Sequence, residues 1–455
     1  MLATLSLRVS PHGLALCPAL LQDTSSSISL GSMRELVLSP VEVSSSSSPV
    51  TVRALVSGLY AFQVVLTQSI DMPLIGSISS LPTYLEVVGL TEPTSYNQLL
   101  IGTIGALYYI GVMLGALVAG WFSDQVGRRR ALICASLWGI TIVPILAASQ
   151  NFAWVIAARI LNGLATGAFD SIGLNWCAET VSHKKRGRSI GFQLCSAAVG
   201  ASVCYFVVFG LRRQQEGDVT WRFPIAFQLV CFLAVLVLTP FLPESPRWLV
   251  KVGMREEARL VVMAIMSYNE TSTEAQESLE RAAEIEVATV AAAISEERAE
   301  KSSASYFSMF FKRDSMHTCR RTWSAFFIQF GTQSLLATGY LAGYGIVIFE
   351  TSGWSSELAA LLSGMCILTQ ATFGLLGALL ADKLGRRVAM MSGTLSGAVF
   401  LSLLGMCAYY VTKYAESDPG LAKSYGNGAV ALLLLWSAQY GATFREYSHT
   451  LSPSS

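Results

Sequence analysis

Two short stretches with the same pattern decide how this sequence is read. Residues 120–129 read GWFSDQVGRR and residues 378–387 read ALLADKLGRR, so Asp-x-x-Gly-Arg-Arg occurs twice, each time directly after an apolar stretch. A basic connector alone would only reflect the preference of Lys and Arg for the cytoplasmic side of a membrane. The same pattern at two equivalent places instead indicates an internal duplication.

The composition indicates a membrane protein. Of the 455 residues, 52% are hydrophobic and only 13% are charged, whereas a soluble domain carries about 25% charged residues. The formal net charge of +1 gives no reason to expect a nucleic-acid partner, which would require a clustered basic face. The nine cysteines and four histidines show no spacing suited to a metal site, so neither a metal nor a cofactor is expected.

Ten stretches are long and apolar enough to cross a bilayer, which needs about 20 residues. They lie at 55–79, 99–122, 131–149, 152–178, 189–210, 222–241, 322–349, 358–381, 388–411 and 428–444. The sequence therefore predicts an all-α polytopic membrane protein. The duplicated pattern follows the second and the eighth of these stretches, so the two copies occupy the same place in two successive sets of spans.

The charges of the connectors predict an orientation. Basic residues gather after the second, fourth and eighth spans, in 128–130, 184–188 and 383–387, whereas the alternate connectors are poor in them. The connector after span five, with Arg212 and Arg213, is the exception. Because Lys and Arg stay on the cytoplasmic side, the N-terminus is predicted to be cytoplasmic.

Along the chain these features divide the sequence into five segments. Two helical bundles are expected, joined by a cytoplasmic connector in which 255–266 and 274–299 suit amphipathic or solvated helices. The segments are a disordered, Ser-rich N-terminal tail (1–51), a six-span bundle (52–241), the connector with its intracellular helices (242–321), a four-span bundle (322–444) and an off-pattern tail (445–455).

On its motifs the chain resembles the sugar porter family of the major facilitator superfamily, in particular its fungal branch. Besides the paired connectors, 159–167 read RILNGLATG in a segment that closes at Glu179, and 243–249 read PESPRWL, the family's most recognisable string. The resemblance covers about residues 52–444. It implies a major facilitator fold of two pseudo-repeated bundles that moves a sugar or polyol by alternating access, coupled to protons, as a monomer in the plasma membrane.

Three charged side chains lie in the interior of the predicted spans and not at their first or last residue, namely Asp71, Arg159 and Asp170. A charge at the bilayer centre costs about 2.5–3.5 kcal/mol, so it is retained where it pairs or lines a wet cavity. The resemblance assigns proton coupling to Asp71 and Arg159: protonation of the carboxylate would release the guanidinium and shift the conformational balance. A water-facing helix end remains open for Asp71, and a local interhelical hydrogen bond is preferred for Asp170.

Sugar recognition requires neutral amides, hydroxyls and aromatic faces. The resemblance leads to three candidate contacts, which are Gln193, Gln333 and Tyr344, and Gln329 is added as a candidate to replace family amides that are missing here. Two departures weaken a glucose-type site, because the family's second Gln is Ser334 here and its Asn is Gly339. For the glutamines, ordinary interhelical hydrogen bonding stays open as the alternative.

A set of charged residues at the cytoplasmic span ends forms, by the same resemblance, a gate network of salt bridges between the two halves. A role in setting the topology alone is the alternative. The set comprises Asp124, Arg128, Arg129, Glu179, Arg188, Glu244, Arg247, Asp382, Arg386 and Arg387.

The resemblance stops within span ten. The family has twelve spans and this chain has about ten, which predicts an incomplete second bundle and a fragment whose transport activity is in question. Two alternatives follow: a non-transporting sugar sensor or interaction protein, for which 242–321 leaves room, and an inactive product of a misassembled gene model. An enzyme is not expected, because no span contains a histidine or a pair of carboxylates suited to catalysis.

Overall fold

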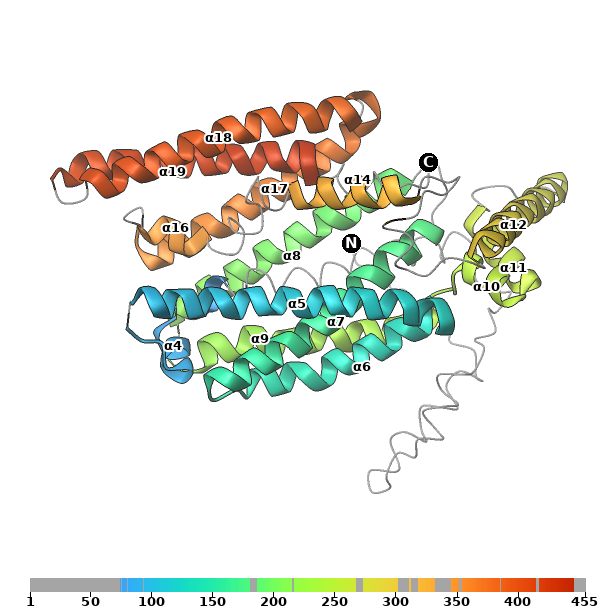
Figure 1. The fold of residues 1–455 in the computed structure, drawn as a ribbon, viewed down its shortest axis with the longest axis horizontal. Helices are drawn as coiled ribbons and strands as arrows, with labels where there is room; N and C mark the ends of the chain where they lie inside the picture. Colours follow the sequence, from blue (N-terminus) through green and yellow to red (C-terminus); the bar gives the residue numbers. More distant parts are fainter. Residues whose placement is uncertain are drawn as a thin grey trace, which may run out of the picture. The chain divides into compact units, whose positions relative to one another are not determined.

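The computed structural model describes residues 74, 76–79, 81–92, 94–180, 186–214, 217–266, 273–301, 311, 318–331, 345–351, 354–384, 386–414 and 417–445. Every described residue belongs to the stretch 46–455, which forms one unit. Within the described part, all regular elements are helices (Figure 1).

The helices fall into three groups along the chain. The first comprises α4 (Pro82–Val88), α5 (Ser95–Val126), α6 (Arg128–Ala147), α7 (Phe152–Thr180), α8 (Arg186–Gln214), α9 (Val219–Leu238) and the 3-10 helix η2 (Thr239–Phe241). The second comprises α10 (Pro246–Val252), α11 (Arg255–Met266) and α12 (Thr273–Lys301). The third comprises α14 (Thr318–Phe330), α16 (Gly345–Thr351), α17 (Ser356–Leu384), α18 (Arg386–Tyr414), α19 (Pro419–Tyr440) and the π-helix η4 (Gly441–Arg445).

Among the described residues, six helices are long and apolar enough to cross a membrane. They are Leu99–Val126, Arg128–Ala147, Phe152–Thr180, Val219–Leu238, Ser356–Gly377 and Val388–Tyr414. These match the predicted spans two, three, four, six, eight and nine. Predicted span five corresponds to α8, whose apolar part, Cys195–Leu211, is shorter. Most of the first predicted span and residues 332–344 of the seventh lie outside the described residues.

The helix that contains most of the last predicted span, 428–444, begins before that apolar stretch. This helix, α19, begins at Pro419, because Asp418 caps it: the side chain accepts hydrogen bonds from the backbone N–H groups of Gly420 and Leu421, each at 3.1 Å. Proline is favoured at the first position of a helix, where no N–H partner is needed. The sequence prediction missed this start because it followed hydropathy rather than capping.

The predicted helices of the connector are confirmed, since α11 covers 255–266 and α12 includes 274–299. Together with α10, which the sequence reading did not predict, they bury a small apolar cluster that includes Trp248, Val262 and Val287. An ion pair between Arg259 of α11 and Glu284 of α12, at 3.1 Å, lies beside it. The connector thus has a core of its own.

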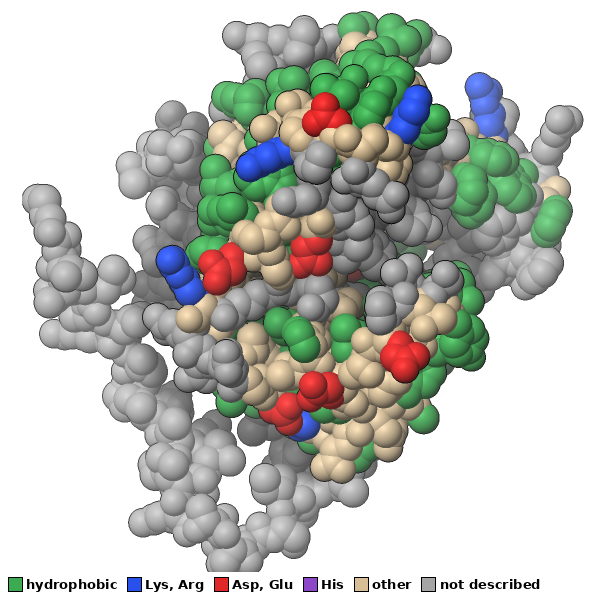
Figure 2. Space-filling model, turned by 90° about the vertical axis from the view of Figure 1, so that its left-hand side faces the viewer, with side chains coloured by type: hydrophobic (Ala, Val, Ile, Leu, Met, Phe, Trp, Pro, Cys, Tyr) green, Lys and Arg blue, Asp and Glu red, His purple; other side chains and the backbone are tan. Residues whose placement is uncertain are grey.

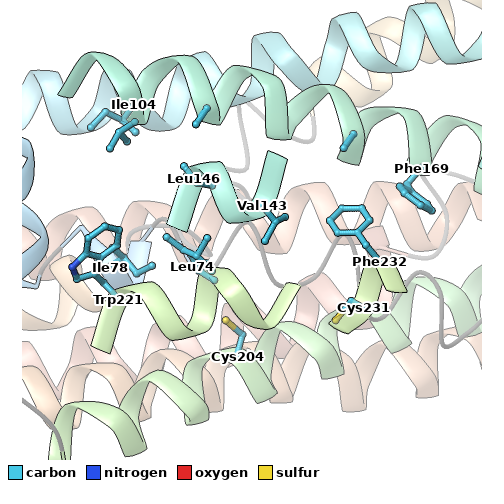
Figure 3. Packing of buried hydrophobic residues seen from close by; sticks show 14 of the residues in the cluster. Leu74, Ile78, Ile104, Val143, Leu146, Phe169, Cys204, Trp221, Cys231 and Phe232 are labelled. Atoms are coloured by element: carbon cyan, nitrogen blue, oxygen red, sulfur yellow. The ribbon is translucent and has the colours of Figure 1, made fainter. Parts of the chain in front are cut away.

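The core of the first group forms where α6 packs against α7 and α9 and α5 packs against α7. Figure 3 shows part of this cluster, with Val143 and Leu146 from α6 and Phe232 from α9 among its labelled side chains. Phe169 of α7 lies against Phe232, with ring centroids 5.4 Å apart. Apolar packing of this kind holds the helix ends that carry the charged residues.

The duplication is visible in the helix boundaries. One residue, Gly127, separates α5 from α6, and one residue separates α17 from α18 at the second copy of the pattern. In the first half α5 packs on α7, and in the second half α17 packs on α19. The joint and the packing of α5 in the first half thus correspond to those of α17 in the second half, as expected for the predicted pair of pseudo-repeated helical bundles.

The backbones of α5 and α7 touch directly, because glycines of each helix face carbonyl oxygens of the other. A Cβ atom on Gly111 would overlap the carbonyl oxygen of Ile160, and one on Gly167 would overlap that of Val112. Small residues allow such close approach between membrane helices, where van der Waals contact replaces the hydrophobic effect as the source of association. No side chain larger than hydrogen fits at these positions without separating the helices.

We expect Gly111→Ala and Gly167→Ala each to destabilise the protein by about 1–3 kcal/mol, as overpacking does. The measurement is the apparent melting temperature of detergent-solubilised protein, followed by fluorescence-detected gel filtration. Gly102→Ala on α5 is the matched control, because a Cβ atom there meets nothing within 4 Å. Equal melting of all three variants would contradict the role of the close contact.

Candidate functional site

The predicted site residues divide sharply between described and undescribed ones. The structure describes the side chains of Asp124, Arg128, Arg129, Arg159, Glu179, Glu244 and Arg247. The other candidates lie outside the described residues or have side chains that are not described; they are Asp71, Arg188, Gln193, Gln329, Gln333, Tyr344, Asp382, Arg386 and Arg387. The described candidates therefore belong to the gate network of the first half and to the surroundings of Arg159.

Arg128, the first residue of α6, is the centre of the charged network. Its Nε and Nη2 atoms donate to the two carboxylate oxygens of Glu179, at 3.1 and 3.0 Å. Its Nη1 atom donates to Asp124, at 2.7 Å, and to the carbonyl oxygen of Ser123, at 2.9 Å. A bidentate pair of this kind adds geometric specificity to charge, and here it ties the end of α7 to the joint between α5 and α6.

Glu244 caps the start of α6 from a distant part of the sequence. Its carboxylate accepts hydrogen bonds from the backbone N–H groups of Arg128, at 2.9 Å, and of Arg129, at 3.2 Å. The first N–H groups of a helix have no partner within the helix, and the helix dipole favours a negative charge at that end. A carboxylate from the PESPRWL string therefore satisfies the donors that begin α6.

Gly127 makes room for this carboxylate. Its φ of +101° lies in the region that side chains rarely adopt, and a Cβ atom there would lie 2.8 Å from Oε2 of Glu244. Glycine is the residue that tolerates both conditions. The glycine of the Asp-x-x-Gly-Arg-Arg pattern is thus explained by the contact with Glu244 as well as by the turn.

Three further interactions involve the PESPRWL string and the helix α10 that begins within it. Trp176 of α7 donates from Nε1 to the carbonyl oxygen of Pro243, at 3.1 Å. Ser245 caps α10 by accepting from the backbone N–H of Trp248, at 3.3 Å. Lys251 of α10 pairs with Asp124, with Nζ 3.3 Å from Oδ2.

Of the predicted gate residues, the structure brings Asp124, Arg128, Glu179 and Glu244 together. Arg129 joins them through its backbone N–H, and Arg247 is exposed on α10. Lys251 was not predicted, although its place four residues after Arg247 puts it one helical turn further along the same helix.

Burial raises the pKa of the Glu244 carboxyl group above its ordinary value. The hydrogen bonds from Ser245, Arg129 and Arg128 and the charge of Arg129 favour the ionised form, but they offset the cost of desolvation only in part. The folded protein therefore binds a proton at Glu244 more tightly than the unfolded chain does.

Arg159 lies on a buried polar stripe of α7 and is only 1% exposed. Asn162 and Thr166 follow it along the same face and are equally buried, and Tyr108 of α5 donates its hydroxyl to Thr166 at 3.1 Å. The spacing of three and four residues places the three polar groups of α7 in one line. Asp170, one turn further on, is half-buried. The sequence reading singled out Arg159 but not the stripe.

The end of the bundle near Arg159 is closed by α4. Tyr84 of α4 is buried, and its ring meets Trp221 of α9 edge-on, with centroids 5.5 Å apart. Burial raises the pKa of the Tyr84 phenol, and the positive charge of Arg159 opposes that rise. On the other side of Trp221, the guanidinium of Arg222 stacks 4.5 Å from the indole ring.

A small pocket in the second half was not predicted. Its polar lining comes from Gln370, which is 5% exposed, and from the hydroxyls of Ser363 and Ser437. Trp436 and Phe349 provide aromatic walls. Amide, hydroxyl and aromatic groups are the combination that suits a neutral polyol, but the cavity as it stands admits only about one water molecule. A polyol would enter only in a conformation in which α17 and α19 are further apart. The signal in the sequence was Gln370, a polar residue within the apolar span 358–381.

Comparison with known sequences gives a consistent result. A family model described as "Sugar (and other) transporter" matches residues 60–449. The MFS-type transporter oryC of Aspergillus oryzae is 29% identical over 411 residues, which are 85% of this chain and 70% of that protein. High-affinity glucose transporter 1 of Candida albicans is 26% identical over 353 residues, and the arabinose-proton symporter of Bacillus subtilis is 24% identical over 320 residues.

The chain spans less than two thirds of the length of the last two relatives, 62% and 64%, and these alignments include 75% and 70% of this chain. Among solved structures, the proton:xylose symporter XylE bound to 6-bromo-6-deoxy-D-glucose matches with a TM-score of 0.71 at 20% sequence identity, over 89% of this chain and 82% of that one. This likeness confirms the predicted major facilitator fold.

The Glu244 cap predicts a difference between two substitutions. Glu244→Ala removes the acceptor for the first N–H groups of α6 and should cost about 1 kcal/mol, as lost caps do. Glu244→Gln keeps one oxygen acceptor without the buried charge and should be tolerated. The apparent melting temperature in detergent measures both, with Glu277→Gln on the exposed surface of α12 as the control. Equal loss in the two Glu244 variants would contradict the capping role.

The raised pKa of Glu244 also predicts that the stability difference between Glu244→Gln and the unmodified protein depends on pH. A carboxyl group whose pKa is raised by folding stabilises the fold while it is protonated, and this contribution is lost as the pH rises from the unfolded value, about 4.3, through the raised value. The stability of Glu244→Gln relative to the unmodified protein should therefore increase over that window. Melting curves recorded across a pH series measure the difference, and a difference that falls with pH would show that hydrogen bonding outweighs burial at Glu244.

Proposed function

Because the chain belongs to the sugar (and other) transporter family, whose model matches residues 60–449, we propose that it carries a sugar or polyol across a membrane by alternating access, coupled to proton movement. The observation that carries this proposal is the buried guanidinium of Arg159 on the polar stripe of α7. Burying a cation in an apolar helix is costly, so it is kept where it has a function.

Proton coupling is assigned to Asp71 and Arg159. Asp71 precedes α4 in the sequence, and α4 lies against α7 close to Arg159. An ionised Asp71 would attract the guanidinium, whereas a protonated one would release it, so that the two protonation states favour different conformations. The names of two similar proteins, an arabinose-proton symporter and a proton:xylose symporter, agree with this assignment.

The network around Arg128 serves as the first-half part of a cytoplasmic gate. Its bonds join the ends of α5, α6 and α7 to α10, so breaking them would free these ends to move. The half-buried pair of Lys251 and Asp124 contributes about 1 kcal/mol at most, but a network of pairs and backbone bonds suits a switch between two states of similar energy. The counterparts in the second half are Asp382, Arg386 and Arg387.

Substrate recognition is assigned to amides and aromatic rings in both halves. Gln193, Gln329, Gln333 and Tyr344 remain the predicted contacts. The pocket around Gln370 adds a described candidate in the second half, which has to widen to admit a sugar because it now holds about one water molecule. A cytoplasmic N-terminus, the plasma membrane and a monomeric state complete the proposal. A sensor that binds sugar without moving it is the alternative, and uptake measurements separate the two.

We expect labelled sugar to enter transporter-deficient cells that express the chain, faster in acidic than in neutral medium. Asp71→Asn should reduce uptake in acidic medium to the level seen at neutral pH, because the group that titrates is gone. Glu86→Gln, which changes an exposed carboxylate on α4, is the matched control. An acid response that survives Asp71→Asn would refute proton coupling at this residue. Binding without uptake in the unmodified protein would favour the sensor.

Gln370→Ala should raise the substrate KM about tenfold, which corresponds to the loss of about 1.4 kcal/mol, the scale of one hydrogen bond. Competition among hexoses, pentoses and polyols for uptake supplies the substrate for this measurement. Thr372→Val is the control, because Thr372 is exposed on α17 and its hydroxyl donates to the carbonyl oxygen of Leu368 in the same helix. An unchanged KM would remove Gln370 from the substrate site.

A further inference from the structure

One face of α18 is exposed along its whole length. Large apolar side chains recur on it at intervals of three and four residues, which places them in a single stripe. Leu395, near its middle, is 73% exposed. In chain order the stripe consists of Val388, Met391, Leu395, Val399, Leu403 and Met406.

The same face ends in an aromatic and a basic residue. Tyr409, three residues after Met406, is 61% exposed, and Lys413 is exposed one turn later. At about 1.5 Å per residue, the distance along the helix from Met391 to Tyr409 is about 27 Å. The hydrocarbon core of a bilayer is about 30 Å thick. When the stripe lies in hydrocarbon, Tyr409 and Lys413 therefore lie at the level of the headgroups, where aromatic residues are enriched.

A stack of three tyrosines supports this end of α18. The rings of Tyr410 and Tyr425 lie 4.9 Å apart, and those of Tyr410 and Tyr414 lie 6.0 Å apart, in each case nearly parallel. Tyr425 belongs to α19, so the stack joins the two helices on either side of their connecting loop. Tyr409 meets Tyr410 edge-on at 5.5 Å, which gives the exposed ring a rigid base.

Lys413 is held beside these rings. Its Nζ atom lies 6.0 Å from the centroids of Tyr409 and Tyr410 and 5.7 Å from that of Tyr414. These distances are within the range of cation–π attraction, and a cation in the last turn of a helix is also favoured by the helix dipole. Figure 2 looks onto the end of the molecule where α18 is joined to α19, and basic side chains stand there singly among hydrophobic ones.

We propose that this face of α18 is a docking surface for a phospholipid, with the headgroup phosphate at Lys413 and an acyl chain along the nearer part of the stripe, from Val399 to Met406. One acyl chain covers one leaflet, about half of a hydrocarbon core that is about 30 Å thick. Lysine binds phosphate as a point charge, and the Tyr409 hydroxyl lies where it donates to the ester or phosphate oxygens of the same lipid. The exposed apolar stripe favours a lipid over a soluble anion, because only a lipid has a chain to place on it. The ammonium group of Lys413 favours a lipid with a phosphate headgroup over one with a neutral headgroup. This inference requires that α18 lies in a membrane, and it does not depend on whether the protein transports a sugar.

Native mass spectrometry of the detergent-purified chain, titrated with phosphatidylglycerol, tests the proposal. We expect the unmodified protein to retain the lipid and Lys413→Gln to bind it about tenfold more weakly. Lys413→Arg should restore binding, because the charge is kept. Lys423→Gln is the matched control, since Lys423 is exposed on α19 and is not among the cations found over the tyrosine rings.

Two results would overturn the proposal. Equal lipid retention by the unmodified protein and Lys413→Gln would show that binding is nonspecific and does not use this end of α18. A dimer detected by light scattering that dissociates on Leu395→Asn would show that a second copy covers the face. A diglyceride without phosphate, titrated in parallel, should bind more weakly than phosphatidylglycerol; equal affinity would refute the role of the headgroup.

Discussion

The arrangement of the first half depends on one short joint, the turn at Gly127, where a helix start and two buried charges meet. Arg128 satisfies carboxylates from α5 and α7 with one planar group, while Glu244 satisfies the backbone donors that begin α6. The two interactions meet at one residue, because Arg128 supplies both the guanidinium and the first N–H of α6. The ends of α5 and α7, the start of α6 and the start of the connector are therefore held together at one place.

Much of the fold could be predicted from the sequence, because its signals are local. Long apolar stretches specify helices such as α7 and α18, and the amphipathic pattern of 255–266 specifies α11 to the residue. The start of α19 was missed because it depends on capping by Asp418 and on the proline that follows. The short α10 was missed because seven residues are too few to show a period.

The candidate site was predictable only in part. The charged residues of the network were identified by resemblance, but their partners depend on tertiary packing. The sequence does not show that Glu244 bonds to backbone N–H groups, that Lys251 pairs with Asp124, or that Gln370 lines a pocket, because these contacts join residues far apart in the chain. Nor does local sequence indicate the tyrosine stack, since Tyr410 and Tyr425 come from different helices. The roles of Asp71 and the four substrate candidates stay predictions, because their side chains are outside the described residues.

The glycine contact between α5 and α7 has a genetic consequence. Every glycine codon begins with two guanines, and each single-base change that alters the residue produces a larger side chain or a stop. At Gly111 and Gly167, where a Cβ atom would overlap a backbone carbonyl, no accessible substitution is harmless. We therefore expect these two positions to tolerate fewer single-base changes than Gly102 on the same helix, where a Cβ atom meets nothing within 4 Å.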